Sequence, residues 1–183
     1  MNITVYMASG DGNYPSFREK ARELGTWIGN RGHRLIYGGS DCGIMGEIAR
    51  SVLAAGGEVI GVEPKYFIDM GYAFNEVTEV LETETMAERR AKLIELGDAF
   101  IAFPGGTGTL EEISEVISHV TLNDTPEYIS GPCIIYNIEG YWDGLRLLLE
   151  SMDKAGFSSK ERRKQVYFAA SLEEVAELLK REG

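Results

Sequence analysis

The segment Phe100-Ile101-Ala102-Phe103-Pro104-Gly105-Gly106-Thr107-Gly108-Thr109-Leu110-Glu111-Glu112 joins an apolar run to a glycine-rich loop and a helix start. The apolar residues predict a buried strand that ends at Pro104, and the helix is expected to begin at Leu110. A strand leading through such a loop into a helix presents backbone N–H groups to an anion. Glycine lets a phosphate approach the main chain closely. The segment therefore predicts a phosphate-binding loop at residues 105–109.

The same residues could also have a purely structural role, without binding a ligand. Thr109 and Glu112 have the spacing of a capping box, in which the glutamate only closes the first turn of a helix. Thr85 with Glu88, and Ser171 with Glu174, share this spacing. Capping alone could explain Glu112, and the loop could be a tight turn without a ligand.

The composition limits the partners. With 183 residues, 44% hydrophobic and 26% charged, the chain is expected to form one domain over residues 1–183. A net charge of −11 argues against nucleic acid polymers and anionic membranes, which bind clustered Lys and Arg. Cys42 and Cys133 are too few for a disulfide scaffold or a zinc motif. No targeting segment or membrane span is visible, so we expect a cytoplasmic protein.

Strand and helix patterns alternate along the chain. Strands are predicted over residues 3–7, 34–37, 58–62, 77–81, 99–103, 133–137 and 166–169. Helices are predicted over residues 15–30, 46–56, 85–97, 110–120 and 142–155 and after Ser171, with a break at 123–126. This alternation predicts an α/β fold, a doubly wound and mainly parallel sheet with helices on both faces.

Ligands of such folds lie at the carboxyl ends of the strands. Three loops of glycine or small residues follow predicted strands, at 8–13, 38–46 and 104–109, so we expect them to converge on one phosphorylated small molecule. The aromatic segment 64–75 is either a surface loop packed on the core or a wall for a planar base.

Three motifs in order resemble one known family. Residues 104–112 resemble the PGGxGTxxE signature of the Lonely Guy family, the cytokinin riboside 5′-monophosphate phosphoribohydrolases, which have also been described as lysine decarboxylases. Residues 37–46, YGGSDCGIMG, are similar to the family's YGGGxxGLMG turn, and residues 86–90, MAERR, are similar to its MHERK segment. The similarity runs from Val5 to about Leu149.

The resemblance implies a Rossmann-like fold, a homodimer, and hydrolysis of a nucleoside 5′-monophosphate, such as AMP or an N6-modified AMP, to free base and ribose 5-phosphate. We expect no metal and no cofactor. Arg89 and Glu112 would be the catalytic pair, and the 105–109 loop would hold the phosphate, with Arg90 where the family usually has Lys. The expected substrate-binding residues are Ser9, Gly38, Gly39, Met86, Arg90, Gly105, Gly106, Thr107, Gly108, Thr109, Glu111 and Ser118.

Several positions depart from the family pattern. Ala87 replaces a His, Ser40 replaces a Gly, Met7-Ala8-Ser9-Gly10 replaces a CGSS-like turn, Ser118-His119 replaces Thr-Trp, and residues 127–131 resemble an insertion. These changes concern the base side of the pocket more than the phosphate side. They leave the identity of the base open.

The chemistry can also be argued from the residue types. Cleaving a ribosyl C1′–N bond builds positive charge on the sugar, which a carboxylate can stabilise while it takes a proton from water. Glu111 and Glu112 lie about 100° apart around a helix, so both cannot face the substrate. Geometry leaves the choice open, and the motif favours Glu112. Arg89 could orient that carboxylate, or could be an exposed helix residue paired with a glutamate.

Two other functions remain as alternatives. One is a carrier that binds a nucleotide or cofactor without turnover. The other is a decarboxylase that uses pyridoxal phosphate on a Schiff-base lysine, although no lysine lies in a glycine-rich loop. The expected homodimer is also indicated by the apolar helices that follow the second and fifth strand loops.

Overall fold

A computed structural model describes residues 1–122 and 125–182. Its centre is a seven-stranded sheet in the order β4-β3-β2-β1-β5-β6-β7, and every pair of neighbouring strands is parallel. The strands are β1 Asn2–Tyr6, β2 Arg34–Tyr37, β3 Glu58–Pro64, β4 Glu79–Thr83, β5 Ala99–Ala102, β6 Cys133–Tyr136 and β7 Val166–Ala169. The predicted α/β fold is confirmed, and all seven predicted strands are present.

The direction of strand succession reverses at β1. From β1 the chain moves outward on one side through β2, β3 and β4, then crosses back to β5 and continues to β7 on the other side. A switch of this kind leaves a crevice at the carboxyl ends of the two central strands, here β1 and β5. Tyr6 pairs with Ala102 at that end, so the loops that follow both strands begin side by side.

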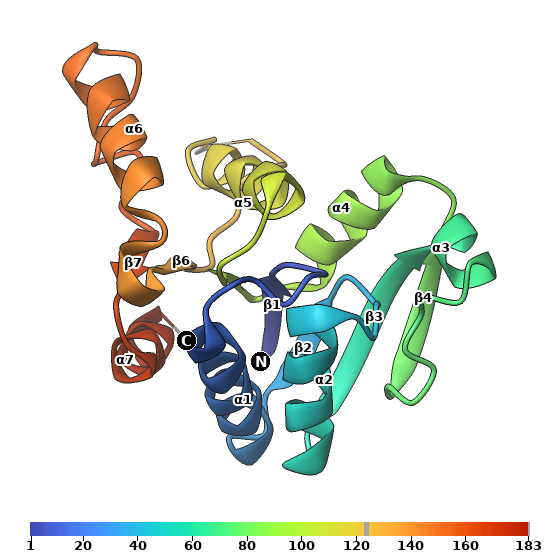
Figure 1. Cartoon of the computed structure of the whole chain (residues 1–183). Coiled ribbons are helices and arrows are strands. Elements are labelled where there is room, and N and C mark those ends of the chain that lie inside the picture. Colours follow the sequence, from blue (N-terminus) through green and yellow to red (C-terminus); the bar gives the residue numbers. More distant parts are fainter. Residues whose placement is uncertain (123–124, 183) are drawn as a thin grey trace.

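Helices cover both faces of the sheet (Figure 1). They are α1 Pro15–Asn30, α2 Gly43–Ala54, α3 Lys65–Asp69, α4 Met86–Leu96, α5 Thr107–His119, α6 Asp143–Lys154 and α7 Leu172–Glu182, with a short 3-10 helix at Ile138–Gly140. Side chains alternate along each strand between two apolar cores, because successive residues of a strand point to opposite faces. One core includes residues of α1, α2 and α7, and the other includes residues of α4, α5 and α6.

Most element boundaries differ from prediction by one or two residues; β4, for example, lies two residues later than expected. Helices α2 and α5 begin three residues earlier than expected, at Gly43 and Thr107, so each glycine-rich loop continues directly into a first helical turn. The segment predicted to be irregular, 64–75, contains the short helix α3. The break expected at 123–126 lies partly outside the described residues, since Asn123 and Asp124 are not described.

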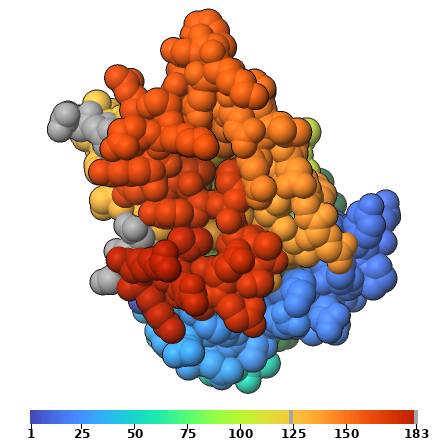
Figure 2. Space-filling model, turned by 90° about the vertical axis from the view of Figure 1, so that its left-hand side faces the viewer, coloured from blue at the N-terminus to red at the C-terminus, as the bar shows by residue number. Residues whose placement is uncertain are grey.

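Helix α6 is the element that extends farthest from the sheet. It and the loop after it form the projection at the top of the face shown in Figure 2. Several large apolar side chains are exposed there: Leu147 is 62% exposed, Leu148 52% and Phe157 89%. None of the helices in the described parts of the chain is long and apolar enough to cross a membrane.

Candidate active site

Loops after β1, β2 and β5 line one cavity of about 670 Å³ at the carboxyl edge of the sheet. The predicted convergence of the three loops is therefore present. Residues of β3, α3 and α4 complete the walls. The lining residues are Met7, Ala8, Ser9, Gly10, Gly38, Ser40, Cys42, Met45, Glu63, Phe67, Tyr72, Met86, Arg89, Gly106, Thr107, Gly108, Thr109, Glu111 and Glu112. The volume is within the usual range for small-molecule pockets, which span about 300–1,000 Å³.

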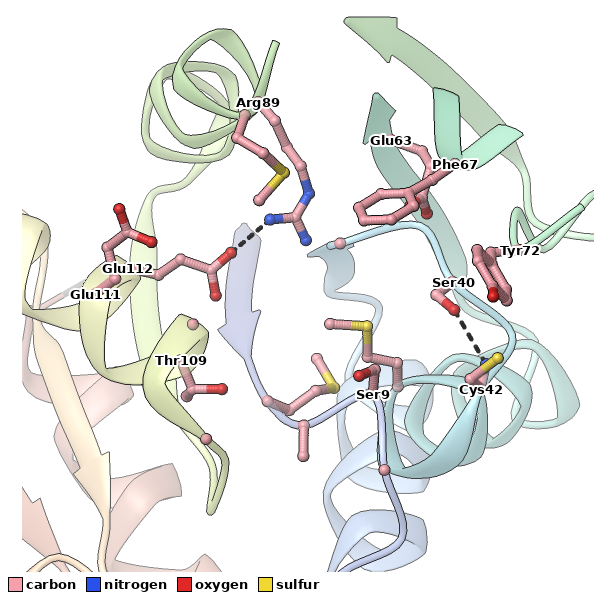
Figure 3. A pocket seen from close by; sticks show the side chains of 18 of the residues that line it. Ser9, Ser40, Cys42, Glu63, Phe67, Tyr72, Arg89, Thr109, Glu111 and Glu112 are labelled. Atoms are coloured by element: carbon pink, nitrogen blue, oxygen red, sulfur yellow. Dashed lines mark hydrogen bonds and ion pairs between the residues drawn. The ribbon is translucent and has the colours of Figure 1, made fainter. Parts of the chain in front are cut away.

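A buried ion pair lies in this cavity between α4 and α5. Arg89 donates from Nη1 to Oε1 of Glu112 at 2.6 Å (Figure 3). The Arg89 Nε group donates to the carbonyl oxygen of Val62, at 3.0 Å, which fixes the guanidinium against the end of β3. Arg89 is only 6% exposed and Glu112 only 7%. Burying a charged group costs free energy unless it is paired. The fold therefore holds the two side chains in contact.

The environment of Glu112 suits a proton acceptor. Burial raises the pKa of its carboxyl group, and the nearby Arg89 guanidinium offsets part of that rise. A carboxylate with a raised pKa can accept a proton from water more readily than an exposed one. The ion pair with Arg89 also fixes the orientation of the Glu112 carboxyl group, which lines the cavity.

The capping interpretation of Glu112 is wrong. Helix α5 begins at Thr107 with Gly106 as its N-cap, and no side chain accepts a capping hydrogen bond there. The other two pairs with this spacing do cap: Glu88 N–H donates to the Thr85 hydroxyl at 3.1 Å, and Glu174 N–H donates to the Ser171 hydroxyl at 3.3 Å. The earlier start of α5 places Thr109 inside the first turn, so Glu112 is free to pair with Arg89.

The first turn of α5 forms the opposite wall from the β3 residues. The first four N–H groups of an α-helix have no acceptor within the helix, and the residues of this turn from Gly106 to Thr109 line the cavity. Gly105 is needed for packing, because a Cβ atom there would overlap the Thr109 side chain. The hydroxyl group of Tyr141 donates to the Gly105 carbonyl oxygen and ties the loop to the start of α6. The result is a rigid, positively polarised edge of the cavity.

Gly38 and Gly39 leave room for two charged side chains. A Cβ atom on Gly38 would overlap the Arg89 guanidinium, and one on Gly39 would overlap the Glu63 carboxyl group. Gly39 also has φ +90°, a conformation that favours glycine. Gly38 borders the cavity itself, whereas the structure gives Gly39 a packing role next to Glu63.

The structure brings most of the other predicted site residues together. Ser9, Met86 and Glu111 line the cavity. The expectation that Glu111 and Glu112 cannot both face the site is therefore wrong, because both border the same cavity from the first turns of α5. Arg90 lies outside the described lining and pairs with Glu111 at 3.2 Å and with Glu115 at 3.1 Å, so it ties α4 to α5. Ser118 lies farther along α5 than the residues of the lining, and its hydroxyl group donates to the Ser114 carbonyl oxygen.

Sequence reasoning missed Glu63, at the carboxyl end of β3. It lines the cavity although it is only 3% exposed. A charged residue closing a run of buried strand residues was the signal that could have identified it, because parallel strands end at the ligand edge. The aromatic segment divides between its two interpretations: Phe67 and Tyr72 line the cavity, while Phe74 packs in the core.

Comparison with known proteins indicates the same family as the sequence motifs. Residues 45–179 match the family described as "possible lysine decarboxylase". The cytokinin riboside 5′-monophosphate phosphoribohydrolase LOG1 of Arabidopsis thaliana is 37% identical over 97% of this chain and 81% of its own length. The cytokinin riboside 5′-monophosphate phosphoribohydrolase of Rhodococcoides fascians is 34% identical over 94% of this chain and 85% of its own.

A solved structure with a different printed function shares the fold. The molybdenum cofactor binding protein of Rippkaea orientalis aligns with a TM-score of 0.72, covering 98% of this chain and 95% of its own, at 24% identity. At that identity the likeness shows the fold alone.

Proposed function

Because this chain belongs to the family of the cytokinin riboside 5′-monophosphate phosphoribohydrolases, we propose that it hydrolyses the N-glycosidic bond of a nucleoside 5′-monophosphate. The products are the free base and ribose 5-phosphate. The observation that carries the proposal is the buried Arg89–Glu112 ion pair, which faces a nucleotide-sized cavity beside the start of α5. AMP and its N6-modified, cytokinin-type derivatives are the substrates we propose.

The pair supplies what the reaction needs. As the C1′–N bond lengthens, positive charge develops on the sugar ring, and the Glu112 carboxylate stabilises it. The same carboxylate takes a proton from the water molecule that attacks C1′. Arg89 orients Glu112 through the 2.6 Å contact and can hold a sugar hydroxyl group with its remaining donors.

The phosphate group is assigned to the other end of the cavity. Thr107, Gly108 and Thr109 of the first turn of α5 line the cavity, and the N–H groups at a helix N-terminus can bind an anion. Arg90 was expected to contact the phosphate, but in this structure its guanidinium pairs with Glu111 and Glu115. Binding through the backbone of the loop therefore accounts for phosphate recognition without that arginine. We propose no role for Ser118 in substrate binding.

Two alternatives fit this site less well. The described lining contains no lysine, which a pyridoxal phosphate Schiff base requires, so a decarboxylase is not favoured. A carrier without turnover would need the cavity but gives no reason for a buried, ion-paired carboxylate. The experiment below separates this alternative from the enzyme.

The test compares the wild type with Glu112→Gln on AMP and on an N6-isopentenyl analogue, measuring free base and ribose 5-phosphate. The variant keeps the size of the side chain, so AMP binding, measured calorimetrically, should persist while turnover falls by about 10²–10⁴-fold. Glu115→Gln, one turn along the same helix and outside the described lining, is the matched control. A wild type that binds AMP without releasing base would support the carrier.

We also propose that the enzyme is a homodimer. The apolar residues of α2 and α5 that suggested a dimer pack largely within the chain, in the two cores. The exposed residues Leu147, Leu148 and Phe157 on and after α6 supply a better argument, because a second copy could bury them. We propose a reducing, cytoplasmic location, in which Cys42 and Cys133 remain free thiols.

A further inference from the structure

Glu63 is a carboxyl group that the Arg89–Glu112 mechanism does not use. It is the second-last residue of β3 and reaches the cavity beside the Phe67 ring, with the Arg89 guanidinium between it and Glu112 (Figure 3). Its Oε2 atom is buried and has no hydrogen-bond partner among the described residues. Buried polar groups are normally paired, so an unpaired carboxyl oxygen at a ligand cavity needs an explanation.

The charged groups around Glu63 do not neutralise a carboxylate. Arg89 lowers the pKa of Glu63, but the donors Nε and Nη1 of its guanidinium are directed to Val62 and Glu112. From β2, Tyr37 faces the same region with a buried hydroxyl group that also lacks a partner. Burial raises the pKa of Glu63 to about 7, and Arg89 offsets part of that effect. With this pKa a large fraction of Glu63 is the neutral carboxylic acid near neutral pH, whereas Glu112 is held in an ion pair.

Glu112 and Glu63 lie on either side of Arg89. The paired carboxyl group of Glu112 has the environment of a base, and the unpaired carboxyl group of Glu63 has that of an acid. We propose that Glu63 is the general acid that protonates the departing base. The inference rests on the proposed function, and it assigns the purine ring to the part of the cavity walled by Phe67 and Tyr72.

The step balances as follows. The C1′–N9 bond breaks and its electron pair stays on the base, while the Glu63 carboxylic acid transfers its proton to a ring nitrogen of the base such as N7. Water forms the new bond to C1′ and gives its proton to Glu112. Solvent then returns a proton to Glu63 and removes one from Glu112, so that the net reaction consumes one water molecule.

The test uses Glu63→Gln with two substrates that differ in their need for a proton. AMP requires protonation of its leaving group, whereas the 4-nitrophenyl glycoside of ribose 5-phosphate releases a phenolate that leaves without one. We expect kcat for AMP to fall by about 10²–10⁴-fold with KM changed less than about threefold, and cleavage of the nitrophenyl substrate to stay within about threefold. The alkaline decline of kcat in the wild type should also be lost in the variant. Glu82→Gln, the exposed register neighbour of Glu63 on β4, is the control.

The outcomes separate the two proposals. Equal losses on both substrates would assign Glu63 to substrate positioning and overturn the general acid, and so would an unchanged kcat for AMP. If the wild type does not cleave the nitrophenyl substrate, the pH profiles decide, and an alkaline limb that persists in Glu63→Gln overturns the proposal. Failure of the wild type to release base from AMP would remove the proposed function itself, and this inference with it.

Discussion

Replacing Glu63 with Gln should make the protein more stable at alkaline pH. Burial raises the pKa of this carboxyl group to about 7 from its usual value of 4.5, and Arg89 only partly offsets the effect. The folded state therefore binds the proton more tightly than the unfolded chain does. Its contribution to stability is fully present below about pH 4.5 and is lost as the pH rises through 7. The residue is 3% exposed, so solvent screens this cost little.

The magnitude follows from the two pKa values. Their difference corresponds to about 3 kcal/mol of unfolding free energy. Glutamine has the shape of the neutral acid and never ionises, so the variant avoids this cost. We expect the variant and the wild type to be equally stable near pH 4.5, and the variant to be more stable at pH 8 by up to that amount.

The assay is equilibrium unfolding in urea at half-unit steps from pH 4.5 to 8.5, with Glu82→Gln as the exposed control. Stability curves of Glu63→Gln and wild type that run parallel over the whole range would refute the reasoning. Such a result would mean that Glu63 is ionised in the folded protein at neutral pH. A general acid at this position would then be untenable as well, although the Arg89–Glu112 assignment would stand.

Three further predictions concern the phosphate loop, the arginine and the dimer. AMP should raise the melting temperature, while adenosine should hardly do so, because charge-assisted hydrogen bonds from the start of α5 to the phosphate contribute about 1.5–3 kcal/mol each. Equal shifts of the melting temperature by AMP and adenosine would contradict the phosphate assignment. Gly38→Ala should displace the Arg89 guanidinium and lower kcat by about 10²-fold in the AMP assay, whereas Gly144→Ala, where a Cβ atom meets nothing within 4 Å, should not. Light scattering at micromolar concentration should show that the wild type is a dimer. Phe157→Ser should shift the equilibrium toward monomer without unfolding the chain, because this side chain is 89% exposed. A wild-type monomer would rule out the proposed dimer.

The amino-acid sequence determined the elements and the edge at which the ligand site forms. Helix α1 and strands β2 and β7 have the predicted bounds, because apolar spacing and glycine breaks act within a few residues of chain. The convergence of the loops after β1, β2 and β5 also followed from sequence, since parallel strands place their carboxyl ends at one edge. The family motifs pointed to Arg89 and Glu112, and the structure places these two side chains in contact across 23 positions of sequence.

Only the tertiary structure decided what each charged residue contacts. The same Ser/Thr-x-x-Glu spacing is a helix cap at Thr85 and Ser171 but not at Thr109, because α5 begins at Thr107 and leaves Glu112 to an arginine from another helix. Arg90, next to Arg89 in sequence, pairs instead with two other glutamates of α5, Glu111 and Glu115. The apolar run before Glu63 indicates a residue near the ligand edge, but it does not indicate what surrounds the carboxyl group. Its burial and its missing partner depend on strand order and on the glycines of a separate loop, which local patterns do not encode.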